Sequence, residues 1–179
     1  MNHFMLDIET LSTKPNAVVT SVGIVEFNHT GVVERFEKHL PIGPQIKKGR
    51  DISDGTLMFW LQQSEEARQQ LVTGQNDLTK KDSVKQGLVE VMEFIGNNPA
   101  GLWGNGAAFD NVILTDLITN FGGQTLWGFW VDRCYRTVKQ FHPNTPLKRI
   151  GTYHRAVDDA ESQAWHLIAL NEESGGTYL

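Results

Sequence analysis

The sequence opens on "MLDIET", residues 5–10, which places two carboxylates inside an otherwise apolar run. Because side chains alternate across a β-strand, Asp7 and Glu9 are expected to project from the same face. Carboxylates are almost never fully buried unless they are paired. The stretch is therefore either an edge strand with a solvated polar face or a buried strand whose two acids share a cation. The apolar residues around them favour the buried, central position.

The composition is that of one globular domain. A chain of 179 residues with 40% hydrophobic and 21% charged residues is long enough to bury a core. It has no apolar run as long as a membrane span, so no membrane partner is expected. Asp7 interrupts the N-terminal stretch, which argues against a secretory signal. Cys134 is the only cysteine, so an intrachain disulfide is excluded and a cytoplasmic location is expected.

The net charge of −5 gives no overall basic surface for nucleic acid. If the partner is a polyanion, local cations or bound metal ions must attract it.

The pattern along the chain predicts an α/β fold. Residues 2–8, 18–28 and 32–40 have the composition of strands, and a turn at residues 28–31 favours antiparallel pairing. Residues 41–55 are rich in proline and glycine and predict a loop. Further along, helical spacing alternates with short apolar runs, which predicts a mixed sheet covered by helices in a single domain over residues 1–179. The expected helices are 56–63, one beginning after Ser64, 83–96, 110–121 and 158–170, and the expected strands are 101–105 and 128–132.

Two more acidic positions stand at junctions between elements. Asp110 follows the short strand and turn of "WGNGAAFDN", where it is either a helix N-cap or a functional carboxylate. In "HRAVDDAE", Asp158 and Asp159 fall in the first turn of a helix, where the helix dipole favours acids. The dipole does not account for His154 directly upstream of them, and a histidine beside carboxylates is a candidate general base.

Taken together, these acids predict a metal site. Four carboxylates crowded into one cleft without cations would repel one another strongly. Two divalent ions, about 3.5–4 Å apart in two-metal sites, would neutralise them and bind a phosphodiester. Oxygen ligands favour Mg²⁺ or Mn²⁺.

At this point the sequence resembles the DEDDh branch of the DnaQ-like 3′–5′ exonucleases, and in particular the compact stand-alone enzymes of phages and bacteria. Their first motif, Asp-x-Glu, matches Asp7 and Glu9, and their second matches Asp110. Their third, His-x-Ala-x-x-Asp-Ala, matches "HRAVDDA", with His154 and Asp159 in register. The resemblance spans nearly the whole chain. It implies a ribonuclease-H-like mixed five-stranded sheet, three antiparallel strands followed by parallel ones, flanked by helices.

The resemblance also implies roles for the motif residues. Asp7, Glu9 and Asp159 would hold one metal ion, with Asp7 bridging to a second ion and Asp110 assisting. His154 would act as general base in the hydrolysis of the terminal phosphodiester, releasing a 5′-mononucleotide. The implied partner is the 3′ end of a single-stranded or frayed nucleic acid, DNA or RNA. A homodimer is compatible with the sequence.

Substrate contacts are expected next to the motifs. By the resemblance, Thr10 and Leu11 would hold the terminal sugar and separate the last bases. Trp103 and Phe109 flank the second motif, and aromatic faces stack on bases with little sequence preference. Core packing is the alternative reading for both rings.

The sequence is also compatible in part with functions other than exonuclease activity. "GNGAAF" follows a strand as dinucleotide-binding motifs do, but Phe109 replaces the third glycine and the segment lies late in the chain, so this reading is set aside. A catalytically silent nucleic-acid-binding module on the same fold, and another metal-dependent phosphodiesterase, remain as alternatives.

Overall fold

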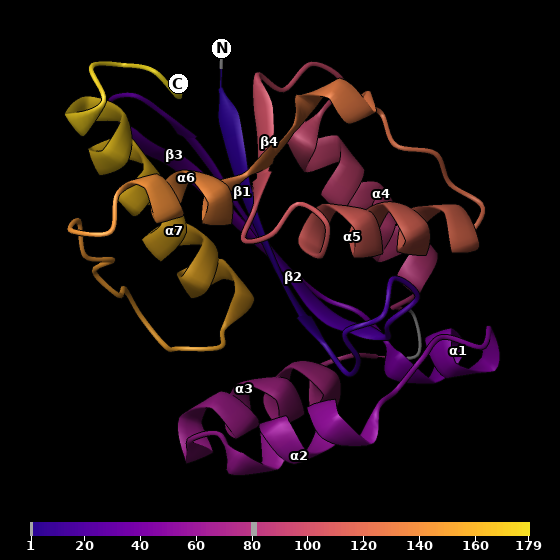
Figure 1. Cartoon of the computed structure of the whole chain (residues 1–179). Coiled ribbons are helices and arrows are strands. Elements are labelled where there is room, and N and C mark those ends of the chain that lie inside the picture. Colours follow the sequence, from indigo (N-terminus) through magenta and orange to yellow (C-terminus); the bar gives the residue numbers. More distant parts are fainter. Residues whose placement is uncertain (1, 80–81) are drawn as a thin grey trace.

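The computed structural model describes residues 2–79 and 82–179, which form one five-stranded sheet with helices on both faces (Figure 1). The strand order is β3-β2-β1-β4-β5. β1 pairs antiparallel with β2, which pairs antiparallel with β3, whereas β4 joins β1 and β5 joins β4 in parallel. The predicted mixed sheet, antiparallel first and parallel later, is thus confirmed. The strands are β1 (His3–Thr10), β2 (Val19–Asn28), β3 (Gly31–His39), β4 (Gly101–Gly104) and β5 (Asp132–Cys134).

β1 is the central strand, which explains its apolar residues on both faces. Leu6 and Ile8 point into one core cluster, and Met5 points into a second cluster on the other side of the sheet. Helices α4 (Val84–Ile95) and α5 (Asp110–Asn120) cover the first face, and α6 (Tyr135–Phe141) and α7 (Ala156–Glu173) cover the second. Asp7 and Glu9 alternate with Leu6 and Ile8, so they lie on the α7 face of the sheet.

A smaller layer, α1 (Ile42–Lys47), α2 (Asp54–Gln62) and α3 (Glu65–Asn76), lies below the sheet in Figure 1. Trp60 of α2 is buried against Leu11 and Val18, which fixes this layer to the end of β1. Ser64 accepts a hydrogen bond from the Ala67 amide and caps α3, as its place in the sequence predicts.

The prediction of a loop over residues 41–55 is wrong at both ends. α1 begins at Ile42, because a proline in the first turn of a helix lacks only an amide that has no partner there anyway. Gln45 then anchors the helix, since its buried amide group accepts a hydrogen bond from Val19 N and donates one to Val19 O. α2 begins at Asp54, capped by Ser53.

The last strand also differs from its prediction over residues 128–132. Phe129–Val131 form a 3₁₀ turn, and the strand itself is Asp132–Cys134, in register with β4 through the pair Leu102 and Asp132. Only Val131 of the turn is buried, so the apolar signal of Phe129 and Trp130 marks exposed rings and not a strand. The helix α6 that follows was not predicted.

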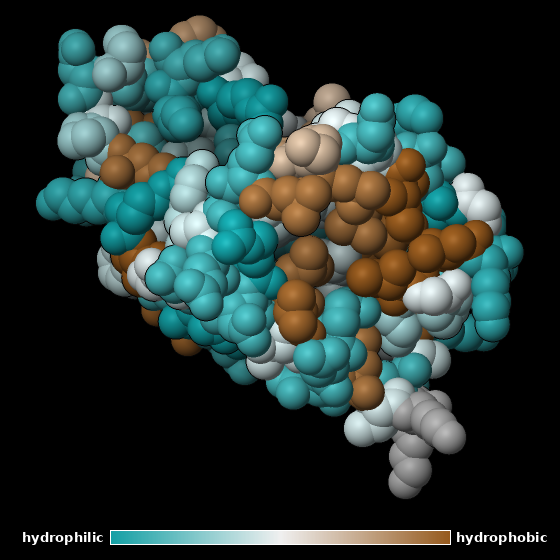
Figure 2. Space-filling model, turned by 90° about the horizontal axis from the view of Figure 1, so that it is seen from below, coloured by the Kyte–Doolittle hydropathy of each residue, from teal (hydrophilic) through white to brown (hydrophobic). Residues whose placement is uncertain are grey.

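No helix in residues 2–79 and 82–179 has both the length and the apolar character needed to span a membrane. Apolar side chains nevertheless gather on the underside of the molecule, where α1 to α3 lie (Figure 2). The exposed large apolar residues of α2 are Leu57, Met58, Phe59 and Leu61.

Candidate active site

Asp7 and Glu9 face the beginning of α7, and a glycine makes this approach possible. Gly23 of β2 is paired with Asp7, and a Cβ atom there would lie 2.2 Å from the carbonyl carbon of Ala156. Only a residue without a side chain lets the first turn of α7 sit directly on the sheet beside Asp7. The close packing at Gly23 therefore brings the third acidic motif to the first.

Asp110 reaches the same place from the start of α5. It is the first residue of the helix, after Phe109 at the N-cap position, so the alternative reading of Asp110 as the N-cap is not what the structure has. Gly104 of β4 lies against Asp110, because a Cβ atom on Gly104 would be 3.0 Å from the Cβ atom of Asp110. The Asp110 side chain is buried, and its Oδ2 atom has no hydrogen-bond partner in the described part of the chain.

The two neighbouring aspartates of α7 point to different places. Asp159 lines the pocket that contains Asp7 and Asp110, and its Oδ2 accepts a hydrogen bond from His154 N at 3.0 Å. Asp158 instead accepts hydrogen bonds from Arg35 of β3 and from Thr152 N. The structure thus places Asp159 with the other motif carboxylates, and Asp158 holds the loop before α7 to the sheet.

His154 has an unusual backbone and aromatic neighbours. Its φ angle is 63°, the only positive value among the non-glycine residues that the structure describes. This left-handed conformation turns the His154 amide towards Asp159. The ring of Tyr153 lies 3.8 Å from the imidazole, centroid to centroid, and those of Phe59 and Trp60 lie 5.2 Å and 5.8 Å from it. A strained backbone of this kind recurs at functional sites.

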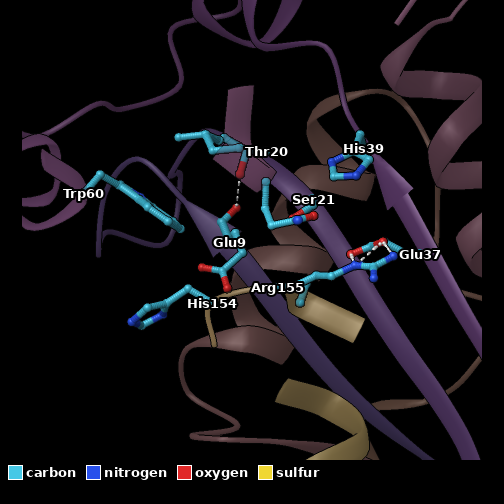
Figure 3. Close-up of a pocket in the computed structure, with 11 residues that line it drawn as sticks. Glu9, Thr20, Ser21, Glu37, His39, Trp60, His154 and Arg155 are labelled. Carbon is cyan, nitrogen blue, oxygen red and sulfur yellow. Dashed lines mark hydrogen bonds and ion pairs between the residues drawn. The ribbon is translucent and has the colours of Figure 1, made fainter. Parts of the chain in front are cut away.

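The five motif residues line one pocket of about 170 Å³. They come from β1, the start of α5, the loop before α7 and the start of α7, and the residues of β1 are about a hundred positions or more from the others in sequence. Figure 3 shows part of this neighbourhood, with Glu9 between the Thr20–Ser21 segment of β2 and the His154–Arg155 segment before α7. The residues lining the pocket include Asp7, Glu9, Asp110, Arg149, His154, Asp159 and Gln163.

Two of these residues were not expected as part of the acidic cluster. Gln163 donates a hydrogen bond from Nε2 to Asp7 Oδ1 at 2.8 Å, and its Oε1 atom has no partner in the described residues. Gln163 stands four residues after Asp159 on α7, so the helical period was a signal that could have found it. Arg149 forms an ion pair with Asp159 and lies over the ring of Tyr153, 4.1 Å from its centroid.

A second, largely apolar pocket of about 540 Å³ adjoins the acidic one and shares Ile8, Glu9, Phe109, Arg136 and His154 with it. Its aromatic wall is formed by Phe109 with Phe59 and Trp60 of α2. Phe59 is 42% exposed, whereas Trp60 is buried.

The expected substrate contacts fall into two groups. Thr10 and Phe109 line the apolar pocket. Leu11 is buried beside Trp60 in the core under α2 and lines neither pocket.

Trp103 does not lie at the site, so the expectation that it stacks on substrate must be corrected. The side chain is 3% exposed and packs in the core beneath α7, and its indole Nε1 donates to His3. The physical reason is position along the sheet, because Trp103 is paired with Met5 of β1, two residues before Asp7, and is covered with Met5 by the core under α6 and α7.

Burial and mutual repulsion change the acidity of the carboxylates. Burial raises the pKa of Asp7 well above its usual value, and the charges of Asp110 and Asp159 raise it further. The pKa of Glu9 is raised for the same reasons, and burial raises the pKa of Asp110 to about 7. Burial also raises the pKa of Asp159, although the Arg149 guanidinium opposes this. Without metal ions, burial and mutual repulsion thus destabilise the charged forms of these carboxylates.

The cluster fits divalent cations. Glu9, His154 and Asp159 each offer a ligand atom within 4.8 Å of the other two. Asp110 lines the same pocket, and its buried Oδ2 atom, which has no hydrogen-bond partner in the described residues, is a further candidate ligand. Buried carboxylates of this number require positive charge, and hard oxygen ligands favour Mg²⁺ or Mn²⁺.

Comparison with known proteins agrees with this geometry. Residues 2–170 match the family model described as the 3′–5′ exoribonuclease Rv2179c-like domain. The chain belongs to this family. The exoribonuclease Rv2179c-like match covers all three acidic motifs, from Asp7 to Asp159.

One curated protein is similar to this chain in sequence over part of its length. The chain is similar to the exodeoxyribonuclease of Enterobacteria phage T4, with 29% identity over 131 residues, or 66% of this chain. The match spans 56% of the length of that phage protein.

Two solved structures resemble the whole chain. The nuclease domain of 3′hExo, a DEDDh family member bound to rAMP, superposes with a TM-score of 0.65 at 12% identity, over 98% of this chain and 94% of that one. Exonuclease X in complex with 5′ overhanging duplex DNA gives 0.60 at 13% identity, over 96% and 92%. At these identities the likeness establishes the fold, which is that of the DEDDh exonucleases.

Proposed function

We propose that this chain is a metal-dependent 3′–5′ exonuclease that releases 5′-mononucleotides from single-stranded or frayed nucleic acid, and that residues 1–179 act as one exonuclease domain. The observation that supports the proposal is that two pockets of different chemistry adjoin each other. One is lined by Asp7, Glu9, Asp110 and Asp159 and suits a phosphodiester held by cations. The other adjoins it, is largely apolar, and suits an unstacked terminal base.

The four carboxylates are proposed to hold two divalent ions, Mg²⁺ or Mn²⁺. Such ions, when bound, neutralise the acids, promote deprotonation of the attacking water and stabilise the charge that develops on the phosphate. The free Oδ2 of Asp110 and the grouping of Glu9 with Asp159 support this assignment. Gln163 fixes the orientation of Asp7 through its hydrogen bond to Oδ1.

His154 is proposed as the general base. Burial lowers the pKa of its imidazole, although the Asp159 charge opposes this, so the ring is neutral and able to accept a proton at ordinary pH. His154 would take a proton from the attacking water, whose oxygen forms a bond to phosphorus as the bond between phosphorus and the 3′ oxygen of the preceding nucleotide breaks. That 3′ oxygen would take up a proton and become the new 3′-hydroxyl. The terminal nucleotide then leaves with a 5′-phosphate. His154 stands in the loop before α7, beside the carboxylates and the aromatic wall, as this role requires.

The apolar pocket is proposed to receive the terminal base. Phe59 and Phe109 offer ring faces there, and base stacking on aromatic side chains tolerates any sequence. A base inside a duplex cannot reach such a pocket without unpairing, which favours single-stranded or frayed ends. Thr10, at the end of β1, lies where the sugar of that nucleotide would be held.

The test is a matched panel of single- and double-stranded RNA and DNA oligonucleotides of one sequence, incubated with purified protein and Mg²⁺ or Mn²⁺. We expect 5′-mononucleotides from the single-stranded substrates, detected by mass spectrometry, and no release in excess EDTA. Asp7→Asn is the inactive control and Asp77→Asn, at the exposed end of α3, is the matched active control. Release of nucleoside 3′-monophosphates, or equal release in EDTA, would contradict the proposal.

A further inference from the structure

Arg136 of α6 lies where the acidic and the apolar pockets meet. Five residues line both pockets, and Arg136 is the only lysine or arginine among them. A terminal nucleotide with its base in the apolar pocket and its phosphate at the carboxylates would pass this point. Arg136 therefore lies between the proposed positions of the base and of the metal-bound phosphate.

The Arg136 guanidinium is held in place without a neutralising partner. Its Nη2 atom donates to the backbone oxygen of Asn105, in the turn that leads to Asp110. The group rests on Gly106, where a Cβ would lie 3.1 Å from the guanidinium carbon. Gly106 has a φ angle of 117°, a conformation that side chains disfavour, so the flat surface beneath Arg136 is built into the turn.

The other arginine of the acidic pocket differs in this respect. Arg149 forms an ion pair with Asp159, so its positive charge is already balanced by a carboxylate of the protein. Arg136 forms no ion pair with any carboxylate in the described part of the chain, residues 2–79 and 82–179. An arginine fixed by a carbonyl oxygen still has donors free for an anion, and the planar guanidinium suits phosphate oxygens.

We propose that Arg136 binds the scissile phosphate of the substrate, the group that becomes the 5′-phosphate of the released mononucleotide. This inference rests on the proposed exonuclease function. It assigns to one side chain a phosphate contact that complements the proposed metal ions, and it predicts that Arg136 distinguishes a nucleotide from a nucleoside.

The experiment compares Arg136→Ala, Arg136→Lys and Arg133→Ala with the unaltered protein. Arg133 is the matched control, because it is an exposed arginine of β5 that donates only to the carbonyl oxygens of Trp130 and Asp132. For Arg136→Ala we expect kcat/KM on a single-stranded oligonucleotide to fall about 10- to 100-fold, the effect of losing one charge-assisted hydrogen bond. Arg136→Lys should recover part of the loss, and Arg133→Ala should stay within about twofold, as an exposed substitution does.

Product inhibition separates phosphate binding from a structural role. Inhibition by a 5′-mononucleotide should weaken about 10-fold or more in Arg136→Ala, while inhibition by the matching nucleoside should not change. Equal weakening for both ligands, or an Arg136→Ala variant that behaves like Arg133→Ala, would overturn the inference. Failure of the unaltered protein to degrade any oligonucleotide would instead overturn the proposed function, so the two failures are distinguishable.

Discussion

Arg149 forms an ion pair with Asp159 inside the pocket that holds Asp7, Glu9 and Asp110. The guanidinium thus stands among the carboxylates as an internal counterion, and it lies against the ring of Tyr153. A divalent ion held by Asp159 must share this carboxylate with Arg149 or displace it. Arg149 is therefore expected to compete with metal binding.

Arg149→Gln should consequently bind Mn²⁺ more tightly than the unaltered protein. The Arg149 side chain is 46% exposed, so solvent screening limits the effect to about 2- to 5-fold in Kd. Calorimetric titration measures the change, with Lys148→Gln as a control that removes the same charge one residue away. Weaker Mn²⁺ binding by Arg149→Gln than by Lys148→Gln would contradict the competition.

The two adjacent aspartates of α7 should respond differently to substitution. Asp159→Asn should abolish exonuclease activity, by about 10³-fold or more on the proposed two-metal chemistry, while the fold persists. Asp158→Ala should retain most of the activity at low temperature but lose about 1–3 kcal/mol of stability, because the Thr152 amide loses its partner and Arg35 keeps only its ion pair with Glu161. Kinetics and thermal melts of both variants test this, and an inactive Asp158→Ala beside an active Asp159→Asn would reverse the assignment.

Removal of metal should make stability depend on pH. The folded pKa of Asp110 is raised from 3.8 to about 7, so the folded state retains a proton that the unfolded state releases. The free energy of unfolding of the EDTA-treated protein should therefore fall as pH rises from about 4 to about 7, in a window that the raised pKa values of Asp7 and Glu9 extend. Asp110→Asn should flatten this dependence, and so should saturating Mg²⁺. Denaturant titrations that show stability increasing over this pH window would contradict the raised pKa values of the carboxylates in the folded protein.

Phe59 and Trp103 provide a matched aromatic pair. Phe59→Ala should raise KM for oligonucleotides roughly 5- to 100-fold, because base stacking contributes about 1–3 kcal/mol, with little change in stability. Trp103→Ala should instead cost about 3–5 kcal/mol of stability, as loss of a core aromatic does. Steady-state kinetics and denaturant unfolding separate the two effects. An unaltered KM in Phe59→Ala would show that the base lies elsewhere.

Asp7, Asp159 and Trp103 show which features of the site can be predicted from the sequence and which cannot. Asp7 and Glu9 were predictable because a strand has a fixed period of two, and the same period makes the central position of β1 clear from its apolar neighbours. The resemblance of "HRAVDDA" to a known motif selected Asp159 over Asp158. Trp103 lies on the same face of the sheet as Asp7 but is paired with Met5, two residues earlier, and the register between β1 and the four-residue strand β4 cannot be predicted from either strand alone.

Other features depend on contacts across long stretches of chain. Gln45 stabilises α1 by bonding to the backbone of Val19, so a segment with the composition of a loop becomes a helix. Phe129 and Trp130 are exposed apolar residues, which a hydrophobic pattern reads as a strand. Arg149 meets Asp159 only because the loop before α7 folds back over the acidic pocket, and the irregular residues 150–155 give no period from which the contact could be predicted.

The activity proposed for this chain is hydrolysis from the 3′ end, at a metal site formed by Asp7, Glu9, Asp110 and Asp159. The most direct measurement is a time course on a single-stranded oligonucleotide labelled at its 5′ end, with the 3′-hydroxyl either free or blocked, in Mg²⁺. We expect a ladder that shortens one nucleotide at a time, only when the 3′ end is free, and no ladder with Asp159→Asn. Immediate release of a labelled mononucleotide, or an equal rate with the blocked end, would contradict it.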